Sequence, residues 1–142
     1  MLYWDTSALF ALVIAEKHSR QLRDQVAKQG ISTAYTSIIT PLEFESAIQR
    51  RFSERTLNLR EADRARLFGV DFRKRAYLVP LDQNALDAAL HLQKIYGLRP
   101  GDAIQLASAR LGTDDPSRVR FLCLDEKLTE AAKREGFQVE ME

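Results

Sequence analysis

The sequence predicts an α/β fold with a central, mostly parallel sheet of about five strands flanked by helices. Three features of the 142-residue chain lead to this prediction. Short apolar or β-branched runs alternate with stretches of helical periodicity, as in a parallel sheet covered on both faces. Capping residues and glycines separate the two kinds of segment. No repeat, low-complexity stretch or linker divides the chain, so we expect a single domain over residues 1–142.

The strands are predicted from runs that are rich in β-branched, aromatic and aliphatic residues. A stretch with helical spacing of apolar residues separates each run from the next, which favours parallel rather than hairpin connections. The predicted strands are Leu2–Trp4, Ile31–Tyr35, Tyr77–Leu81, Phe121–Leu124 and Phe137–Val139.

Helix boundaries are predicted from capping signals. Thr40-Pro41 places a cap residue before a first-turn proline, and Asn58 and Asp82 each precede an amphipathic stretch. Apolar residues recur at near-helical spacing in Ala85–Tyr96, which predicts a core-facing helix. The glycines expected to close helices are Gly97, Gly112 and Gly136.

The composition is that of an ordinary globular protein. Hydrophobic residues make up 45% and charged residues 29%, which excludes a disordered or fibrous chain. The single cysteine, Cys123, cannot form an internal disulfide and fits a reducing cytoplasm. The N-terminus lacks signal-peptide features, and the apolar run Ala8–Ala15 is too short to cross a bilayer. We therefore expect a cytoplasmic protein that neither is exported nor spans a membrane.

Charge is distributed unevenly although the net charge is only +1. The segment Arg50–Arg75 holds nine basic and four acidic residues, a net charge of +5 that leaves −4 for the rest of the chain. One part of the protein could therefore contact phosphates while another holds cations. A solvated helix face explains the basic segment equally well, and the pattern alone leaves both interpretations open.

Two aspartates directly follow predicted strands. Asp5 comes after the first strand, and Asp125 comes after the strand Phe121–Leu124. Ligands of open α/β sheets bind outside the carboxyl ends of the strands, so both side chains could belong to a site. Aspartate at a strand-to-helix junction is also a favoured helix cap, and for either residue alone the cap is the more common role.

Two further acidic residues have similar alternatives. Glu43 stands at the capping-box position relative to Thr40, where a glutamate folds back onto the amide of the cap residue. Asp102 opens the predicted helix Ala103–Leu111 and could cap it. Because Asp82 occupies an equivalent junction, spacing and periodicity do not separate caps from ligands.

Chemistry favours a hard cation if these carboxylates meet. Mg²⁺ and Mn²⁺ are held by a few carboxylates together with water and phosphate oxygens. Soft-ligand metal sites have no support, because His18 and His91 are isolated histidines on helical segments and no His-x-x-x-His pair is present. The sequence also lacks GxGxxG, P-loop and GxSxG motifs.

Four segments in order resemble those of the PIN-domain nucleases, especially the VapC-type toxins of bacterial and archaeal toxin–antitoxin pairs. The first is Asp5-Thr6-Ser7-Ala8-Leu9, and the second is Ser37–Glu43. The third is Leu98–Ala109, which contains Pro100-Gly101-Asp102-Ala103, and the fourth is Phe121-Leu122-Cys123-Leu124-Asp125, followed by Glu130–Ala132 and Gly136–Val139. The likeness spans nearly the whole chain, and the ordered set is far more specific than any single motif.

The resemblance implies a PIN-like fold and a metal-dependent endoribonuclease. It makes Asp5, Glu43, Asp102 and Asp125 the acidic quartet that holds Mg²⁺ or Mn²⁺, with Ser7 as the supporting hydroxyl. We expect Asp5 and Asp102 to be direct ligands and Glu43 and Asp125 to act through water. Asp82 matches no ligand of the family.

The resemblance also implies the partners. They are an RNA substrate, a cognate antitoxin docked across the active-site groove and a second copy of the toxin in a homodimer. For RNA phosphates, the candidates within the basic segment are Arg50, Arg51 and Arg55. The apolar stretch Ala8–Ala15 could serve a partner as well as the core, although burial within the monomer explains it equally.

Two departures from the family pattern stand out. Cys123 occupies a position where relatives often carry a small hydroxyl residue, which affects hydrogen bonding around Asp125. The stretch Gly112–Arg120, with Asp114 and Asp115, matches no family motif and is predicted to be a surface loop with solvated carboxylates.

Two other functions remain as alternatives. A phosphotransferase or phosphatase could use Asp5 as a nucleophile, but the haloacid-dehalogenase-like pattern requires another aspartate where Ser7 stands. A non-catalytic PIN-like module could bind RNA or protein without turnover, although such a module need not keep all four acids.

Overall fold

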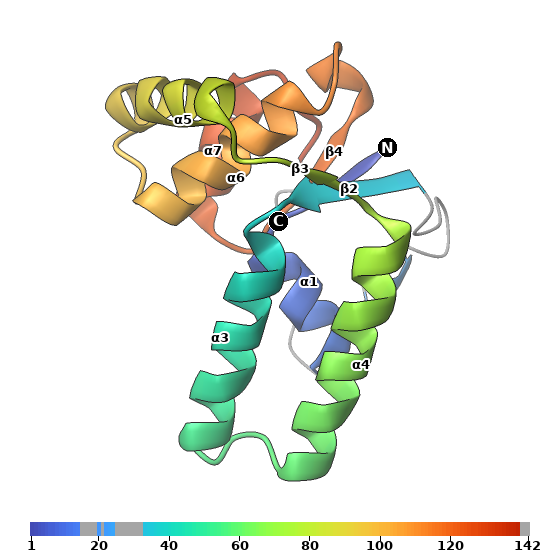
Figure 1. Ribbon diagram of the computed structural model, residues 1–142. Helices are drawn as coiled ribbons and strands as arrows, with labels where there is room; N and C mark the ends of the chain where they lie inside the picture. The colour runs from blue at the N-terminus through green and yellow to red at the C-terminus, as the bar shows by residue number, and fades with distance from the viewer. Residues whose placement is uncertain (15–19, 21, 25–32, 140–142) are drawn as a thin grey trace.

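The computed structural model describes residues 1–14, 20, 22–24 and 33–139. Its central sheet has four strands in the order β3-β2-β1-β4, and every neighbouring pair is parallel. The predicted α/β class is therefore confirmed, with four strands among the described residues rather than about five. Figure 1 shows the sheet with its flanking helices. The strands are β1 (Leu2–Trp4), β2 (Ala34–Ser37), β3 (Tyr77–Val79) and β4 (Arg120–Leu122).

Helices cover both faces of the sheet. Side chains of α1, α3 and α4 form one buried cluster, and side chains of α5, α6 and α7 form a second. Figure 1 shows α3 and α4 as a helical pair that extends away from the sheet. The helices are α1 (Thr6–Val13), α3 (Thr40–Ser53), α4 (Leu59–Arg75), α5 (Gln83–Tyr96), α6 (Pro100–Leu111) and α7 (Glu126–Arg134), with a short 3₁₀ helix, η2 (Pro116–Arg118).

The predicted strand at Phe137–Val139 is only a single parallel bridge between Gln138 and Arg120. Gln138 exchanges two backbone hydrogen bonds with the β4 region, at 2.8 and 3.0 Å, while the amide of Phe137 turns back to the end of α7. The expectation of a fifth strand was therefore wrong. The chain touches the sheet edge at one residue and does not run along it.

Three other predicted strands have different boundaries. β3 ends at Val79, because Pro80 follows and has no amide hydrogen to donate. β4 ends before Leu124, whose amide hydrogen bonds the side chain of Ser7 instead of a neighbouring strand. β2 continues to Ser37, and the first two residues of the predicted strand Ile31–Tyr35 lie outside the described residues, as does His18.

Capping signals located most helix ends correctly. Asn58 caps α4 in a full capping box, Asp82 caps α5 through the amide of Ala85 at 2.9 Å, and Gly97 ends α5 with a φ of 65°. Gly112 and Gly136 likewise lie just past α6 and α7. The predicted cap at Thr40 was wrong, because Ile39 takes the cap position and supplies no side-chain bond.

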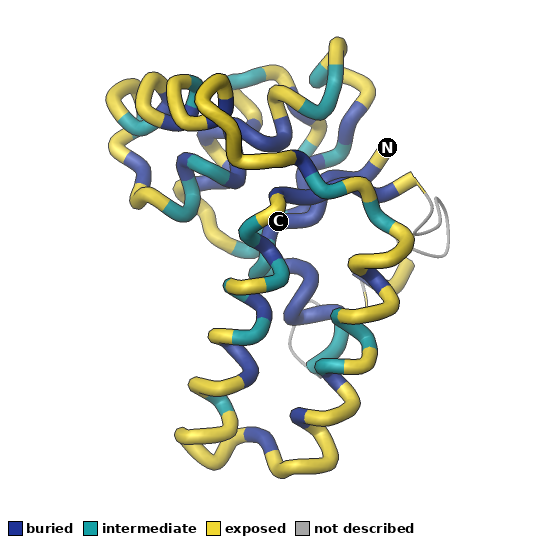
Figure 2. Tube along the Cα trace, in the orientation of Figure 1, coloured by how far each residue is buried: buried dark blue, intermediate teal, exposed yellow. Residues whose placement is uncertain are grey.

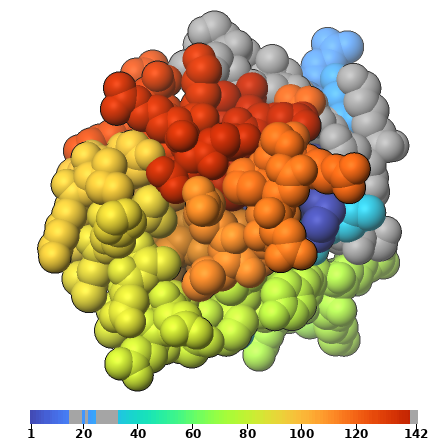
Figure 3. All heavy atoms as spheres, turned by 90° about the horizontal axis from the view of Figure 1, so that it is seen from above, coloured from blue at the N-terminus to red at the C-terminus, as the bar shows by residue number. Residues whose placement is uncertain are grey.

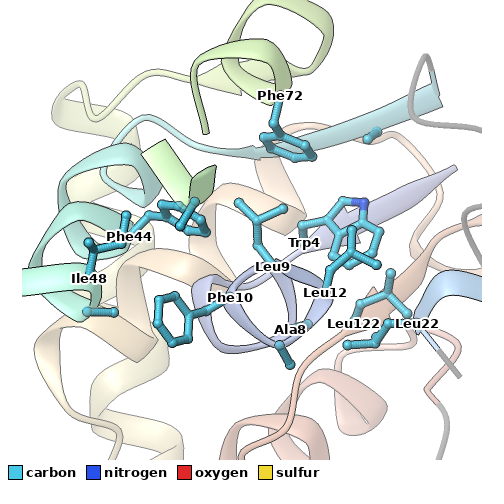
Figure 4. Close-up of a cluster of buried hydrophobic side chains, with 14 of the residues drawn as sticks. Trp4, Ala8, Leu9, Phe10, Leu12, Leu22, Phe44, Ile48, Phe72 and Leu122 are labelled. Carbon is cyan, nitrogen blue, oxygen red and sulfur yellow. The ribbon is translucent and has the colours of Figure 1, made fainter. Parts of the chain in front are cut away.

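The first core cluster buries the apolar stretch that follows β1. Leu9 and Leu12 of α1 pack beneath the sheet, and Figure 4 shows them beside Trp4 and Leu122. Phe72 of α4 meets the indole ring of Trp4 edge-on, with a centroid distance of 6.3 Å. In the described part of Ala8–Ala15, most side chains thus belong to the monomer core.

The second cluster lies on the opposite face of the sheet. Tyr3 of β1 is fully buried there, stacked on Phe121 and edge-on to Tyr35, with both ring centroids 5.0 Å away. Figure 2 shows the buried strands between more exposed helices, and in Figure 3 the yellow-to-red part of the chain, which includes α5, α6 and α7, covers most of one side of the molecule. None of the helices within the described residues is long and apolar enough to span a membrane.

Candidate active site

The sheet topology brings four chain segments to one edge. β1 and β4 are neighbours, so Asp5 and Asp125, which follow them, lie at adjacent carboxyl ends. β2 lies on the other side of β1 and leads into α3, whose first turn carries Glu43. Asp102 comes from the first turn of α6. The four predicted acidic residues therefore come from four different helix starts at the same edge.

Asp5 is both a helix cap and a buried charge. Its carboxylate accepts hydrogen bonds from the Ser7 amide at 3.2 Å and the Ser7 hydroxyl at 2.5 Å, and only 5% of the residue is exposed. Burial raises the pKa of Asp5 to about 6, with a further contribution from the charge of Glu43, despite the opposing hydrogen bonds from Ser7. The cap and ligand interpretations thus do not exclude each other.

Glu43 does not form the capping box that its spacing allows. Its Oε1 atom accepts hydrogen bonds from the hydroxyl of Thr6 and from the side-chain amide of Gln105, both at 2.7 Å. The capping box does not form because Thr40 lies inside the helix and its hydroxyl forms a hydrogen bond with the hydroxyl of Thr36 at 2.7 Å. The Glu43 carboxylate is therefore directed toward α1 and α6.

Asp102 is half-buried in the first turn of α6. Burial raises its pKa, and the charges of Asp125 and Glu43 raise it further, whereas those of Arg99 and Lys127 lower it. The charges of two acids and two bases therefore act on Asp102.

Asp125 caps α7 and is exposed. Its carboxylate accepts a hydrogen bond from the Leu128 amide at 2.8 Å, and its own amide donates to the sulfur of Cys123 at 3.3 Å. Burial raises the pKa of the Cys123 thiol well above its usual value, with the charge of Asp5 adding to the effect. Cys123 is thus a neutral thiol in the turn before Asp125, not a thiolate ligand.

Ser7 connects two parts of the site. Its hydroxyl donates to Asp5 and accepts the amide of Leu124 at 3.1 Å, so it ties the start of α1 to the loop between β4 and α7. This contact holds the helix starts that carry Asp5 and Asp125 next to each other.

Gly101 leaves room for the second oxygen of Glu43. A Cβ atom at position 101 would lie 2.9 Å from Glu43 Oε2, which is closer than nonbonded atoms tolerate. Glu43 therefore has Oε1 anchored by two donors and Oε2 against the turn that carries Asp102. A side chain at position 101 would therefore require the Glu43 carboxylate to shift.

The donor set fits a hard divalent cation. All four acids offer carboxylate oxygens, and their mutual repulsion is what a bound cation would relieve. As they stand, no three or more histidine, cysteine, aspartate or glutamate side chains in the described ranges are arranged as a ligand set for a metal ion. Carboxylates that repel one another are expected to draw together when a cation neutralises them.

The remaining carboxylates of interest lie elsewhere. Asp82 caps α5, and Asp114 and Asp115 are exposed, with Asp115 capping η2 through Ser117 at 3.0 Å. The surface-loop prediction for Gly112–Arg120 is therefore largely confirmed, although the segment also holds η2 and the first residue of β4.

The three predicted RNA contacts lie at the far end of α3 from Glu43. Arg50 faces Glu54 at 3.9 Å, and the guanidinium of Arg51 lies 5.5 Å from the ring centroid of Phe10. Arg55 follows the helix with a φ of 60°. Seven residues of helix separate Glu43 from Arg50, a rise of about 10 Å, so these arginines do not join the acidic cluster.

Two polar residues of the site were not predicted. Thr6 and Gln105 both contact Glu43, and Gln105 is 1% exposed on the buried face of α6. For Gln105 the sequence contained a usable signal: it is a polar residue three positions after Asp102, and residues at this spacing share one face of a helix.

Comparison with protein families agrees with this geometry. The family model of the PIN domain matches residues 2–133, which is nearly the whole chain. The chain belongs to the PIN domain family. No curated protein sequence matches closely enough to be counted as a relative.

PIN domains are generally nucleases that act on RNA and usually bind divalent metal ions. Membership places the acid-bearing edge of this sheet in a nuclease fold. The match gives no support to the phosphotransferase alternative.

Proposed function

We propose that the chain is a metal-dependent endoribonuclease that hydrolyses RNA phosphodiesters with Mg²⁺ or Mn²⁺ held by Asp5, Glu43, Asp102 and Asp125. One observation carries this proposal. In this PIN domain, the four acids lie at the starts of α1, α3, α6 and α7. Carboxylates gathered at one edge of the sheet repel one another, and a bound divalent cation would relieve that repulsion.

We assign the roles from burial and hydrogen bonding. Asp5 and Asp102 are direct ligands. Burial raises the pKa of both carboxyl groups, and a bound cation would stabilise their ionised forms. Glu43 and Asp125 act through water, orienting the attacking water or a second ion. Ser7 holds Asp5 in place. A bound divalent ion supplies the charge that activates water and stabilises the phosphorane-like transition state.

The experiment that tests this function is an RNA cleavage assay with the purified chain. We expect cleavage of a mixed single-stranded and structured RNA in Mg²⁺ or Mn²⁺, none in excess EDTA, and recovery when the metal is restored. A chain that binds RNA without turnover under all these conditions would be the non-catalytic module instead.

RNA phosphates have two sets of basic partners in this proposal. Arg99 and Lys127 are exposed beside Asp102, and Lys127 Nζ is held by the carbonyl of Gly97 at 2.7 Å. An ammonium group has three donors, so Lys127 keeps donors for a phosphate. We place these two cations at the scissile phosphate. The predicted contacts Arg50, Arg51 and Arg55 then hold RNA away from the cleavage point.

A salt titration separates the two sets. We expect the Arg99→Gln/Lys127→Gln variant and the Arg50→Gln/Arg55→Gln variant each to weaken RNA binding and to flatten the dependence of log K on log salt by about 0.7 per lost contact. Only the first pair should also lower the cleavage rate at saturating RNA, because only it lies beside the acids. Unchanged affinity and salt slope in either variant would remove that pair from the interface.

We further propose that the protein is the toxin of a VapC-type toxin–antitoxin pair. An apolar cavity of about 300 Å³ lies between α3 and α4, against α1 and β3. Phe44, Ile48 and Val70 line it, and the Arg66–Glu45 ion pair at 2.9 Å borders it. Such a pocket suits apolar side chains of an antitoxin peptide. The homodimer and the single-domain organisation of residues 1–142 remain proposals from the family resemblance.

A further inference from the structure

A buried hydrogen-bond network lies directly behind Glu43. Gln105 of α6 is 1% exposed, and its Nε2 atom donates to Glu43 Oε1 at 2.7 Å. On the other side, its Oε1 atom accepts the hydroxyl hydrogen of Tyr3 at 2.5 Å. Tyr3, in the middle of β1, is 0% exposed. A polar side chain that is shielded from water needs hydrogen-bond partners for its donors and acceptors.

Tyr3 and Glu43 together determine which way the amide of Gln105 points. The phenol hydroxyl of Tyr3 donates its hydrogen to the carbonyl oxygen of Gln105. The amino group then faces Glu43. The reversed amide would place two acceptor oxygens 2.7 Å apart at the Glu43 carboxylate, which is repulsive.

Thr6 completes the anchoring of the same oxygen. Its hydroxyl accepts from Gln105 at 3.1 Å and donates to Glu43 Oε1 at 2.7 Å. Glu43 Oε1 therefore receives hydrogen bonds from two neighbouring donors, which hold the carboxylate in one rotamer.

A chain of threonines keeps the second amino hydrogen of Gln105 in place. Thr36 donates to the carbonyl of Trp4 at 2.5 Å, so Thr40 must donate to Thr36 across their 2.7 Å contact. Thr40 can then only accept from Gln105, at 3.0 Å. The two amino hydrogens of Gln105 thus face three acceptors, on Glu43, Thr6 and Thr40, so one hydrogen is shared between two of them.

We propose that Gln105, oriented by Tyr3, is a positioning residue that fixes Glu43 with Oε1 anchored and Oε2 presented to the cation site. This role rests on the proposed function. Oε2 faces Gly101, where a Cβ atom would lie only 2.9 Å away, so the presented oxygen borders the turn that carries Asp102. Neither Gln105 nor Tyr3 touches the substrate, because both are buried.

Tyr3→Phe tests the orienting contact, with Tyr35→Phe as its matched control. Both tyrosines are 0% exposed on adjacent strands, and both hydroxyls bond α6. The hydroxyl of Tyr35 goes to the backbone carbonyl of Ala109 at 2.7 Å and has no connection to Glu43. Each variant loses one buried phenol hydrogen bond and keeps its ring, so the two should lose similar stability.

The readouts are Mn²⁺ affinity by calorimetry without RNA, and kcat and KM for RNA cleavage. We expect Tyr3→Phe to bind Mn²⁺ about 10-fold more weakly and to lose kcat by a similar factor, the usual effect of removing the support of a ligand. KM for RNA should not change, because the substrate cannot reach β1. Tyr35→Phe should retain wild-type Mn²⁺ affinity and kcat.

Gln105→Met gives a second measurement. It removes the amide from α6 with little change in volume, and we expect a larger loss of Mn²⁺ affinity, up to about 100-fold. Ser108→Ala is its control, since Ser108 is 1% exposed on the same helix and its hydroxyl makes no hydrogen bond among the described residues. If Gln105→Met does not fold, the Tyr3→Phe comparison decides alone.

The outcomes separate this proposal from the function on which it rests. If wild type binds Mn²⁺ and cleaves RNA but Tyr3→Phe matches Tyr35→Phe in both readouts, the positioning role is overturned and the nuclease remains. If wild type neither binds Mn²⁺ nor cleaves RNA, the proposed function fails and takes the positioning role with it. A selective loss in Tyr3→Phe with unchanged KM supports the proposal.

Discussion

Asp5→Asn is expected to lower metal-dependent RNA cleavage by about 10³-fold or more while the fold is kept. The amide has nearly the shape of the carboxylate and can still accept the hydrogen bonds from Ser7. It carries no charge, however, and a direct carboxylate ligand contributes several kcal/mol of electrostatic stabilisation, which corresponds to a rate factor of this order. The measurement is kcat in saturating Mg²⁺ with circular dichroism of the same sample.

Asp82→Asn is the control for this loss. Asp82 is also an aspartate at the start of a helix, but it caps α5 away from the acidic cluster, and asparagine caps equally well. It should cleave RNA at the wild-type rate. If the Asp5 variant retains full activity, Asp5 is a cap and not a ligand.

The same Asp5→Asn variant is expected to be more stable than wild type at pH 7.5 in EDTA. The pKa of Asp5 is raised to about 6 in the folded protein, compared with about 3.9 in an unfolded chain. The folded state therefore holds the proton more tightly, and stability falls as the pH rises from about 4 to 6. Above pH 6 the ionised, 95%-buried carboxylate costs about 2–3 kcal/mol, which asparagine removes.

Thermal unfolding at pH 4 and pH 7.5 measures this effect. We expect the variant to unfold on the order of 5–10 °C above wild type at pH 7.5 and at nearly the same temperature at pH 4, where the wild-type carboxyl is protonated. Asp82→Asn should differ from wild type at neither pH. A variant that is less stable at pH 7.5 would mean that the hydrogen bonds from Ser7 outweigh the burial of charge. Such gains in stability on loss of a functional charge are typical of strained sites.

The α/β class followed from alternation of short apolar runs and helical periodicity, since both are set by local side-chain spacing. Boundaries were harder to predict where a tertiary contact competes with a strand. Leu124 looks like strand in the sequence, but the Ser7 hydroxyl takes its amide. Phe137–Val139 has strand composition, yet it meets the edge of β4 at one bridge. Neither contact is visible in the local sequence.

For the site, the order of motifs was more informative than any single residue. Spacing alone made Glu43 a capping-box glutamate, and the structure instead directs it to Thr6 and Gln105 on two other helices. Asp5 and Asp125 are caps as their junctions predict, and both also lie at the acidic edge. A cap signal therefore does not argue against a role in a site.

Contacts between distant residues were beyond the reach of sequence patterns. The bond between Tyr3 and Gln105 joins positions 102 residues apart, and the apolar surroundings of Tyr3 suggest nothing but a core residue. The composition of the basic segment Arg50–Arg75 likewise did not predict how far its arginines lie from the four acidic residues. The predicted basic segment Arg50–Arg75 does not include Arg99 and Lys127. The charges of these two residues lower the pKa of Asp102.

The most direct test of the central claim is anomalous diffraction from crystals of the chain grown or soaked in Mn²⁺. We predict an anomalous peak at the carboxyl edge of β1, bounded by the carboxylates of Asp5 and Asp102, and its absence in crystals of Asp5→Asn. A peak elsewhere on the molecule, or an empty edge at saturating Mn²⁺ with all four carboxylates in their present positions, would contradict the account.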